Sequence, residues 1–356
     1  MTSTDWTTGR TAVAFIALGA APLVGVGVPE GEVVVETFDS RVLRGNALRD
    51  PTKRDVAIYL PPKYDPAKRY PAAYGIVGYT GTGKMLLGVD PLGEDLKTKL
   101  DRLIRTGRMG PMIVPLVDCF TRVGGNQYIN SSATGRYDDY LRKEIVPFVE
   151  SKYPVSRRGI WGKSSGGYGS IVQGMLHPDT WSALADHSGD ALFEFCYVMD
   201  FPKALAAFRR RGGPGNWLRW YWREPNRRRE EMAPVLNTIG MAAHYSPNPR
   251  SKEMGVDFPF DLETGEWRPD VWARWRAWDP VNMLDRYAAR LRRLRLVYID
   301  CGTQDQYNLI WGARVLHRKL LDRRIKHVYE EFEDTHSDID YRYDVSLPLL
   351  WKALRG

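Results

Sequence analysis

The sequence predicts an α/β fold in which helices cover both faces of a mostly parallel central sheet. Apolar segments rich in β-branched residues alternate with amphipathic segments of helical period along most of the chain. A glycine-rich turn at residues 158–170 joins one such strand directly to a helix of small residues. The chain has 356 residues, of which 43% are hydrophobic, so it is long enough to bury the core that a covered sheet needs.

Three strands are predicted in the first part of the chain. Residues 32–38 and 55–60 are rich in valine and other β-branched residues, and a Pro-Pro pair ends the second strand. Residues 70–77 form the third strand and run into the loop G-Y-T-G-T-G at residues 78–83. The loop lacks the glycine spacing of a phosphate-binding loop, and no Ser or Thr follows Lys84. The other interpretation is that a backbone N–H of this loop faces an oxyanion.

Alternating helices and strands follow. An amphipathic helix is predicted at residues 95–106, a buried strand at 111–118 and a second helix at 138–153. The strand at 159–161 then leads through the glycine-rich turn into a helix that ends near Leu176. Because each helix lies between two strands, this alternation favours a parallel sheet.

The pattern breaks after a short strand predicted at residues 181–185. Residues 192–280 are rich in Trp, Arg, Pro and Gly, and we interpret them as an insertion over the mouth of the sheet, whose aromatic residues suggest a cap or a wall of a pocket. The regular pattern then resumes, with predicted strands at 294–300 and 327–333 and predicted helices at 309–323 and 343–354. The predicted organisation is an N-terminal apolar segment (1–29), a core (30–191 and 281–356) and the insertion (192–280).

The apolar run from Thr11 to Val28 is a weak candidate for a membrane span, because it is glycine-rich and contains Pro22. The residues before it include Asp5 and only one arginine, and no A-x-A site closes the run, so we expect no cleaved signal. The sequence therefore favours a cytoplasmic protein. Secretion is the alternative if the run acts as a signal segment.

Composition excludes several classes of protein. The formal net charge is +8 and the pI about 9.3, but the arginines are spread along the chain and no nucleic-acid-binding motif accompanies them. Three widely spaced cysteines favour buried thiols over a disulfide framework, and no spacing of metal ligands is found. We therefore expect no metal, no other cofactor and no nucleic-acid partner.

The turn at residues 158–170 contains the motif with the clearest chemistry. Gly162-Lys163-Ser164-Ser165-Gly166 fits the G-x-S-x-G nucleophile elbow, in which a strained turn lifts a serine hydroxyl above the sheet. The motif alone is weak, since glycine and serine are common in ordinary turns. Ser165 is the less suitable nucleophile, because the motif centred on it has no upstream glycine.

A nucleophilic serine needs a base and an orienting carboxylate, and two later residues lie where these are expected. Asp305 follows the strand at 294–300, and His336 follows the strand at 327–333, in the order Ser, acid, His. Both lie at the carboxyl ends of predicted parallel strands, the edge at which the elbow also lies. His187 is the rival base, and Asp190 is the alternative acid.

The remaining site residues are predicted from their places beside these three. The backbone N–H groups of Ser165 and of Tyr79, in the glycine-rich loop, are expected to form the oxyanion hole. Thr80, Lys163, His187 and Asp190 are expected to line the substrate pocket.

The motifs together resemble the esterase D / enterochelin-esterase-like family of the α/β-hydrolases, from about Ser40 to Leu354 without most of the insertion. The resemblance includes the glycine-rich loop, the elbow and the segments R-D-V-A-I-Y-L-P-P-K-Y (54–64), G-G-N-Q-Y-I-N-S-S-A-T-G-R-Y (124–137), H-S-G-D (187–190), C-G-T-Q-D (301–305) and D-T-H-S (334–337). It implies an α/β-hydrolase fold and a serine carboxylesterase with Ser164, Asp305 and His336 as its triad. Two positions depart from the family pattern: Lys163 replaces a common His, and Ser165 replaces a common Met or Gln.

The sequence thus predicts a serine carboxylic-ester hydrolase that acts on a small-molecule ester through an acyl-enzyme. An acyltransferase with the same triad and an alcohol or sugar acceptor is one alternative, and a non-catalytic binding protein on the same fold is another. The sequence leaves open whether the protein forms a homo-oligomer and which ester it uses, although the insertion's aromatic and arginine residues would suit a bulky or anionic group.

Overall fold

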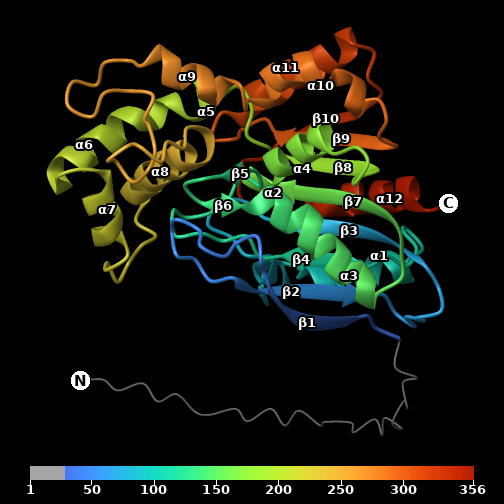
Figure 1. Cartoon of the computed structure of the whole chain (residues 1–356). Coiled ribbons are helices and arrows are strands. Elements are labelled where there is room, and N and C mark those ends of the chain that lie inside the picture. The colour runs from blue at the N-terminus through green and yellow to red at the C-terminus, as the bar shows by residue number, and fades with distance from the viewer. Residues whose placement is uncertain (1–28) are drawn as a thin grey trace, which may run out of the picture.

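A computed structural model describes residues 29–356, so the apolar run that ends at Val28 lies outside the described residues. A twisted sheet of eight strands forms the centre of this part of the chain (Figure 1). In the order in which they lie across the sheet, the strands are β1 (Glu32–Asp39), β2 (Lys53–Leu60), β4 (Val114–Val117), β3 (Tyr70–Ile76), β7 (Val155–Lys163), β8 (Ala183–His187), β9 (Leu296–Gly302) and β10 (Val328–Phe332).

Strand direction confirms the predicted mostly parallel sheet. Among these eight strands only β2 runs against its neighbours, and all strands from β4 to β10 are parallel. The carboxyl ends of β3, β7, β8, β9 and β10 therefore lie along one edge of the sheet. The loops that follow these strands contain every residue predicted for catalysis.

Helices cover both faces of the sheet, each over its own hydrophobic cluster. One face carries α1 (Leu96–Arg105) and α12 (Tyr343–Leu354), whose leucines pack on Trp161 and other side chains of the central strands. The other face carries α3 (Val146–Lys152), α4 (Ser165–Leu176), α10 (Pro280–Leu291) and α11 (Leu309–Asp322).

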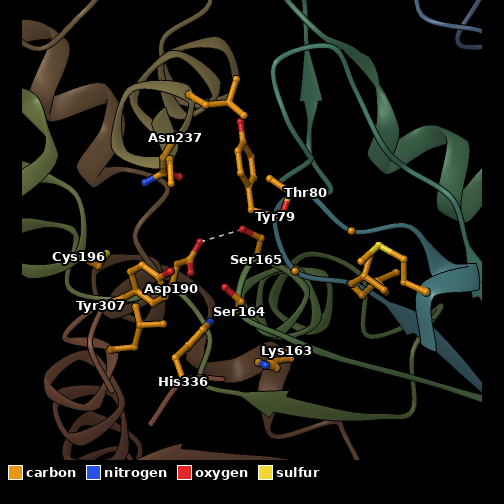
Figure 2. A pocket seen from close by; sticks show the side chains of 18 of the residues that line it. Tyr79, Thr80, Lys163, Ser164, Ser165, Asp190, Cys196, Asn237, Tyr307 and His336 are labelled. Atoms are coloured by element: carbon orange, nitrogen blue, oxygen red, sulfur yellow. Dashed lines mark hydrogen bonds between the residues drawn. The ribbon is translucent and has the colours of Figure 1, made fainter. Parts of the chain in front are cut away.

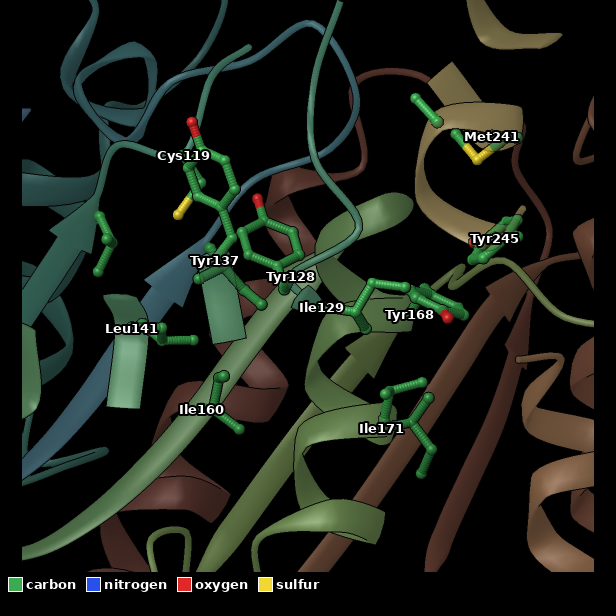
Figure 3. Close-up of a cluster of buried hydrophobic side chains, with 14 of the residues drawn as sticks. Cys119, Tyr128, Ile129, Tyr137, Leu141, Ile160, Tyr168, Ile171, Met241 and Tyr245 are labelled. Carbon is green, nitrogen blue, oxygen red and sulfur yellow. The ribbon is translucent and has the colours of Figure 1, made fainter. Parts of the chain in front are cut away.

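The core beneath α4 is closely packed, as Figure 3 shows for Tyr128, Ile160 and Ile171. These side chains are at most 2% exposed, and burial of a large apolar side chain stabilises the fold by about 1.5–3 kcal/mol. Tyr128 also has a polar role. Its hydroxyl accepts a hydrogen bond from the Val77 N–H (2.9 Å) and donates one to the Val77 carbonyl (2.5 Å). The core thereby fixes the end of β3, where the glycine-rich loop begins.

The segment between β8 and β9 is mainly helical and gathers beside one end of the sheet (Figure 1). Its helices before α10 are α5 (Phe193–Cys196), α6 (Phe201–Arg211), α7 (Pro214–Tyr221), α8 (Ala233–Tyr245) and α9 (Pro269–Arg276). In its interior the centroid of the Trp275 ring lies 5.6 Å from that of Phe201 and 5.6 Å from that of Tyr245. These aromatic residues form a core of the segment itself, which explains the high tryptophan content.

Two segments differ from their predicted form. The helix predicted at 138–153 is divided into α2 (Tyr137–Asp139), a π-helical turn (Tyr140–Ile145) and α3. Pro147 has no N–H to donate, so the regular α-helical ladder is interrupted there. Strand β8 begins and ends two residues later than predicted, because its pairing with β7 and β9 continues to the polar residue His187.

Within residues 29–356, no helix combines the length and apolar character needed to cross a bilayer. The short hairpin of β5 (Asn130–Ser131) and β6 (Gly135–Arg136) completes the regular structure described.

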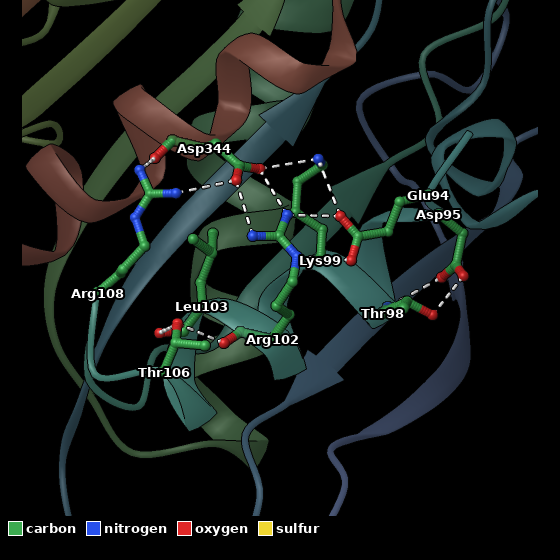
Figure 4. A network of polar contacts seen from close by, with 9 residues as sticks. All are labelled: Glu94, Asp95, Thr98, Lys99, Arg102, Leu103, Thr106, Arg108 and Asp344. Atoms are coloured by element: carbon green, nitrogen blue, oxygen red, sulfur yellow. Dashed lines mark hydrogen bonds and ion pairs between the residues drawn. The ribbon is translucent and has the colours of Figure 1, made fainter. Parts of the chain in front are cut away.

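Helices α1 and α12 are joined by a network of charges centred on Asp344 (Figure 4). The Asp344 carboxylate accepts hydrogen bonds from Lys99 (2.9 Å) and Arg102 (2.9 Å), and Arg108 contacts it at 3.1 Å. Glu94 binds the same Lys99 and Arg102 side chains from the start of α1. Burial raises the pKa of the Asp344 carboxyl, but the hydrogen bonds from Arg102 and Lys99 outweigh burial and lower the pKa to about 2.

We predict that Asp344→Asn lowers the free energy of unfolding at neutral pH by roughly 1–3 kcal/mol, because three cationic side chains lose their shared anion. Because the pKa of Asp344 is lower in the folded state, its ion pairs contribute their full stability above the pKa of an unfolded aspartate, about 3.9. This stability is lost as the pH falls towards about 2. Urea unfolding of the wild-type protein and of Asp344→Asn, at neutral and at acidic pH, measures the difference in their free energy of unfolding. The exposed Asp322→Asn is the control, and a difference that stays constant down to acidic pH would contradict the role of Asp344.

Candidate active site

The turn between β7 and α4 has the strained geometry of a nucleophile elbow. Ser164 lies at φ 59° and ψ −125°, outside the regions that non-glycine residues normally adopt. A Cβ atom added to Gly162 would lie 2.3 Å from the Ile76 carbonyl oxygen, and one added to Gly166 would lie 2.5 Å from the same atom. Both glycines are therefore required, because the end of β3 crosses directly against the turn.

Backbone contacts hold Ser164 on both sides. Its N–H donates to the His187 carbonyl (2.9 Å) at the end of β8, and its own carbonyl accepts from the Tyr168 N–H (2.9 Å). The glycine-rich loop also approaches the serine, since a Cβ added to Gly78 would lie 3.2 Å from the Ser164 Cβ. Three adjacent strands thus determine where the serine hydroxyl lies.

Two N–H groups beside Ser164 are free to bind an anion. Ser165 opens α4, and the first N–H groups of a helix have no acceptor within the helix. Within residues 29–356, neither the Ser165 N–H nor the Tyr79 N–H has a hydrogen-bond acceptor. The next loop N–H, from Thr80, donates to the Gly124 carbonyl (2.8 Å) and so fixes the loop. The Tyr79 hydroxyl donates to the Val123 carbonyl (2.5 Å), which anchors the ring away from the serine.

His336 and Asp305 form a buried pair. His336 Nδ1 lies 2.7 Å from Asp305 Oδ2, and the residues are 7% and 6% exposed. The other carboxylate oxygen, Oδ1, accepts the N–H groups of Tyr307 (2.9 Å) and Leu309 (3.4 Å). In the neutral tautomer whose Nδ1–H donates to this carboxylate, Nε2 is the nitrogen that can accept a proton.

The His336 ring is directed towards the Ser164 side chain, as Figure 2 shows. No hydrogen bond joins the two side chains, both of which belong to the described part of the chain. The ring of Tyr307 packs edge-on against His336, with ring centroids 4.9 Å apart.

Ser164 and His336 line a cavity of about 420 Å³, a volume suited to a small organic molecule. Five further residues predicted for the site also line it: Tyr79, Thr80, Lys163, Ser165 and Asp190. Asp305 lies behind His336. No tryptophan within residues 29–356 lines the cavity, but the aromatic ring of Tyr197 from the insertion does. The insertion also contributes Cys196, Asp200, Ala233, Pro234, Leu236 and Asn237 to the lining.

His187 is not where the sequence predicts it. Its side chain is 0% exposed and does not line the cavity. Its Nδ1 lies 2.7 Å from Asp300 Oδ1 and its Nε2 lies 2.8 Å from Ser346 Oγ, beneath the sheet edge and against α12. The expectation that His187 contacts substrate, and its rivalry with His336 as the base, are therefore wrong. Strand alternation explains the error, because the side chain points to the face opposite the elbow.

Lys163 is partly buried at the edge of the cavity (Figure 2). Burial lowers the pKa of its ammonium group, and the carboxylates of Asp340, Asp338 and Asp305 partly offset this effect. Its role in substrate binding remains a prediction.

Sequence reasoning missed several residues that shape the site. Gln127 donates to Ser165 Oγ (2.8 Å), and Tyr197 donates to Asp190 (2.8 Å). Asp200 and Asn237, joined by a 3.2 Å hydrogen bond, belong to the cavity wall formed by the insertion. Gln127 lies within the segment 124–137 that carried the family resemblance, which was the available signal. The insertion residues had no such signal.

Comparisons with known proteins show the family and the fold of the chain. Residues 47–348 match the family model described as Putative esterase. Similar solved structures include a ferulic acid esterase with 18% identity and a TM-score of 0.57, covering 92% of this chain and 100% of that chain. The S-formylglutathione hydrolase from Agrobacterium tumefaciens has 15% identity and a TM-score of 0.57, covering 92% of this chain and 97% of that chain.

A third similar structure, the ferulic acid esterase from Anaeromyces mucronatus in complex with ferulic acid, has 17% identity and a TM-score of 0.53, covering 93% of this chain and 94% of that chain. At these identities the structural matches establish the shared fold, while the family model covers most of the sequence. The chain belongs to the Putative esterase family and is a serine esterase with an α/β-hydrolase fold.

Proposed function

We propose that the protein hydrolyses carboxylic esters through an acyl-enzyme on Ser164, with His336 as general base and Asp305 as the carboxylate that orients it. The observation that carries this proposal is the 2.7 Å pair of His336 Nδ1 and Asp305 Oδ2 beside the cavity that Ser164 lines. The elbow strain and the two free N–H groups support the same assignment.

In the first half of the reaction, the Ser164 hydroxyl attacks the ester carbonyl carbon while its proton passes to His336 Nε2. Asp305 stabilises the imidazolium that forms. The negative charge on the former carbonyl oxygen is bound by the N–H groups of Ser165 and Tyr79. The intermediate then collapses: the carbon–alkoxide bond breaks, His336 gives its proton to the leaving alkoxide, and the alcohol departs.

In the second half, water attacks the acyl-enzyme and gives a proton to His336, and the same N–H groups bind the second oxyanion. Cleavage of the bond to Ser164 releases the carboxylic acid and returns the proton to the serine. Each oxyanion donor in such a site contributes on the order of 100- to 1000-fold in kcat. Side chains of residues 192–280 line the cavity, and in our proposal this segment forms a cap over the bound ester. The segment would then determine which esters the enzyme selects.

We predict that Ser164→Ala lowers kcat by on the order of 10⁴-fold or more, because no covalent intermediate forms. The measurement is hydrolysis of short nitrophenyl esters, with intact-mass analysis after treatment with a fluorophosphonate probe. The wild-type protein should gain one probe adduct at Ser164, and the variant none.

Ser165→Ala is the matched control for this experiment, because it keeps the backbone N–H at that position and removes only the hydroxyl. It should still be labelled at Ser164. Labelling of Ser164→Ala at Ser165, with activity retained, would show that the neighbouring serine is the nucleophile.

We predict that Asp305→Asn lowers kcat by about 10⁴-fold while the fold is retained, because an amide favours the tautomer whose Nε2 carries the proton and cannot act as a base. Steady-state kinetics measures the loss in kcat, and circular dichroism checks that the fold is retained. Asp338→Asn is the control: this exposed carboxylate is close in sequence to His336, and asparagine tolerates its φ of 55°. Near-normal activity of Asp305→Asn, with a large loss in Asp190→Asn, would instead assign Asp190 as the acid.

A further inference from the structure

The cavity contains a buried carboxylate that the proposed reaction does not use. Asp190 is 6% exposed and lines the cavity between the elbow and the insertion. No lysine, arginine or histidine within residues 29–356 forms an ion pair with it. A buried carboxylate without a cationic partner is costly, and such groups are retained mainly where they serve a function.

The hydrogen bonds of Asp190 are unevenly divided between its two oxygens. Oδ2 accepts from the Tyr197 hydroxyl (2.8 Å), the Ser165 hydroxyl (3.2 Å) and the Gln127 side-chain amide (3.4 Å). These three side chains are themselves at most 4% exposed. Oδ1 has no donor among the described residues, and Figure 2 shows the dashed contact to Ser165 at the opposite oxygen. The three donors thus fix the carboxylate with Oδ1 available to the cavity.

A second layer holds the donors in place. The Tyr197 hydroxyl lies 3.2 Å from the Tyr245 hydroxyl, and the Gln127 amide donates 2.8 Å to Ser165 Oγ. Because these groups are rigidly packed, Oδ1 is a preorganised acceptor rather than a flexible surface charge.

We propose that Asp190 Oδ1 binds a hydroxyl group of the substrate, so that the esterase prefers esters carrying a hydroxyl, on the acyl or the alcohol part, over the same esters without it. This inference rests on the proposed function and adds the chemical class of its substrate. A polar group left unpaired in a buried site costs free energy, so a site of this kind discriminates against the analogue that lacks the hydroxyl.

A hydroxyl fits this position better than an ammonium group. Burial raises the pKa of the Asp190 carboxyl, although the hydrogen bond from Tyr197, the charge of His336 and the hydrogen bonds from Ser165 and Gln127 oppose the rise. A hydroxyl can donate to the ionised carboxylate and can accept from the protonated acid. An ammonium group is attracted only to the ionised form, and it would share the cavity with the cationic Lys163.

The test compares matched esters with and without a terminal hydroxyl. One arm places the hydroxyl on the acyl chain of nitrophenyl alkanoates, and the other places it on the alcohol of alkyl acetates. In wild-type enzyme, kcat/KM should favour the hydroxylated member by at least about tenfold in one arm, which identifies the part of the ester that reaches Asp190.

Asp190→Asn is the informative variant. The three donors hold the amide oxygen at the position of Oδ2, so the neutral amide NH₂ faces the cavity, and a weaker neutral hydrogen bond replaces the one between the substrate hydroxyl and the charged carboxylate. The variant should lose about 10- to 100-fold in kcat/KM on the hydroxylated ester and little on its partner. Asp200→Asn, which changes another carboxylate of the same cavity, should keep the preference.

Several results would overturn the proposal. These are equal kcat/KM values for both members in wild-type enzyme, an equal loss on both esters in Asp190→Asn, or a stronger preference for an ammonium-bearing ester. Hydrolysis of the unhydroxylated esters, and its loss in Ser164→Ala, tests the proposed function separately. If no ester is turned over, calorimetric binding of both ester members to Ser164→Ala still decides whether the hydroxyl is recognised.

Discussion

The close crossing of the end of β3 and the β7–α4 turn is the constraint on which the site depends. Ile76 packs its carbonyl against Gly162 and Gly166 at distances that no side chain would permit. This contact brings the glycine-rich loop against Ser164, next to which the N–H groups of Tyr79 and Ser165 have no acceptor among residues 29–356. The strain at Ser164 is sustained by the packing of the strands around it, since β8 also binds its backbone N–H.

Much of this arrangement could be predicted from the sequence. The two glycines of the elbow are required because no side chain fits beside the Ile76 carbonyl, and this requirement is visible in the sequence as the G-x-S-x-G spacing. Strand ends in a parallel sheet share one edge, which is why Asp305 and His336 could be placed beside each other from sequence order alone. Their 2.7 Å contact agrees with that reasoning. Periodicity also located the helices and strands of the core, apart from the interruption at Pro147.

The position of the His187 side chain and the packing of the insertion could not be predicted, because both depend on contacts between residues that are distant in sequence. His187 is the last residue of β8, whereas His336 lies in the loop after β10, and the His187 side chain is bound by Asp300 and Ser346. Whether a strand includes such a residue depends on pairing with its neighbours, which the sequence near His187 does not show. Many aromatic residues of the insertion pack on one another across long distances in sequence, so composition alone does not show that Tyr197 lines the cavity while the tryptophans do not.

Helix α12, the last element of the chain, covers one whole cluster of the core and supplies Ser346 to His187. His187 in turn accepts the Ser164 N–H through its backbone carbonyl, so α12 is connected to the elbow through a single residue of β8. A substitution that displaces α12 would therefore also disturb the position of Ser164, although the helix itself lies on the opposite face of the sheet from α4.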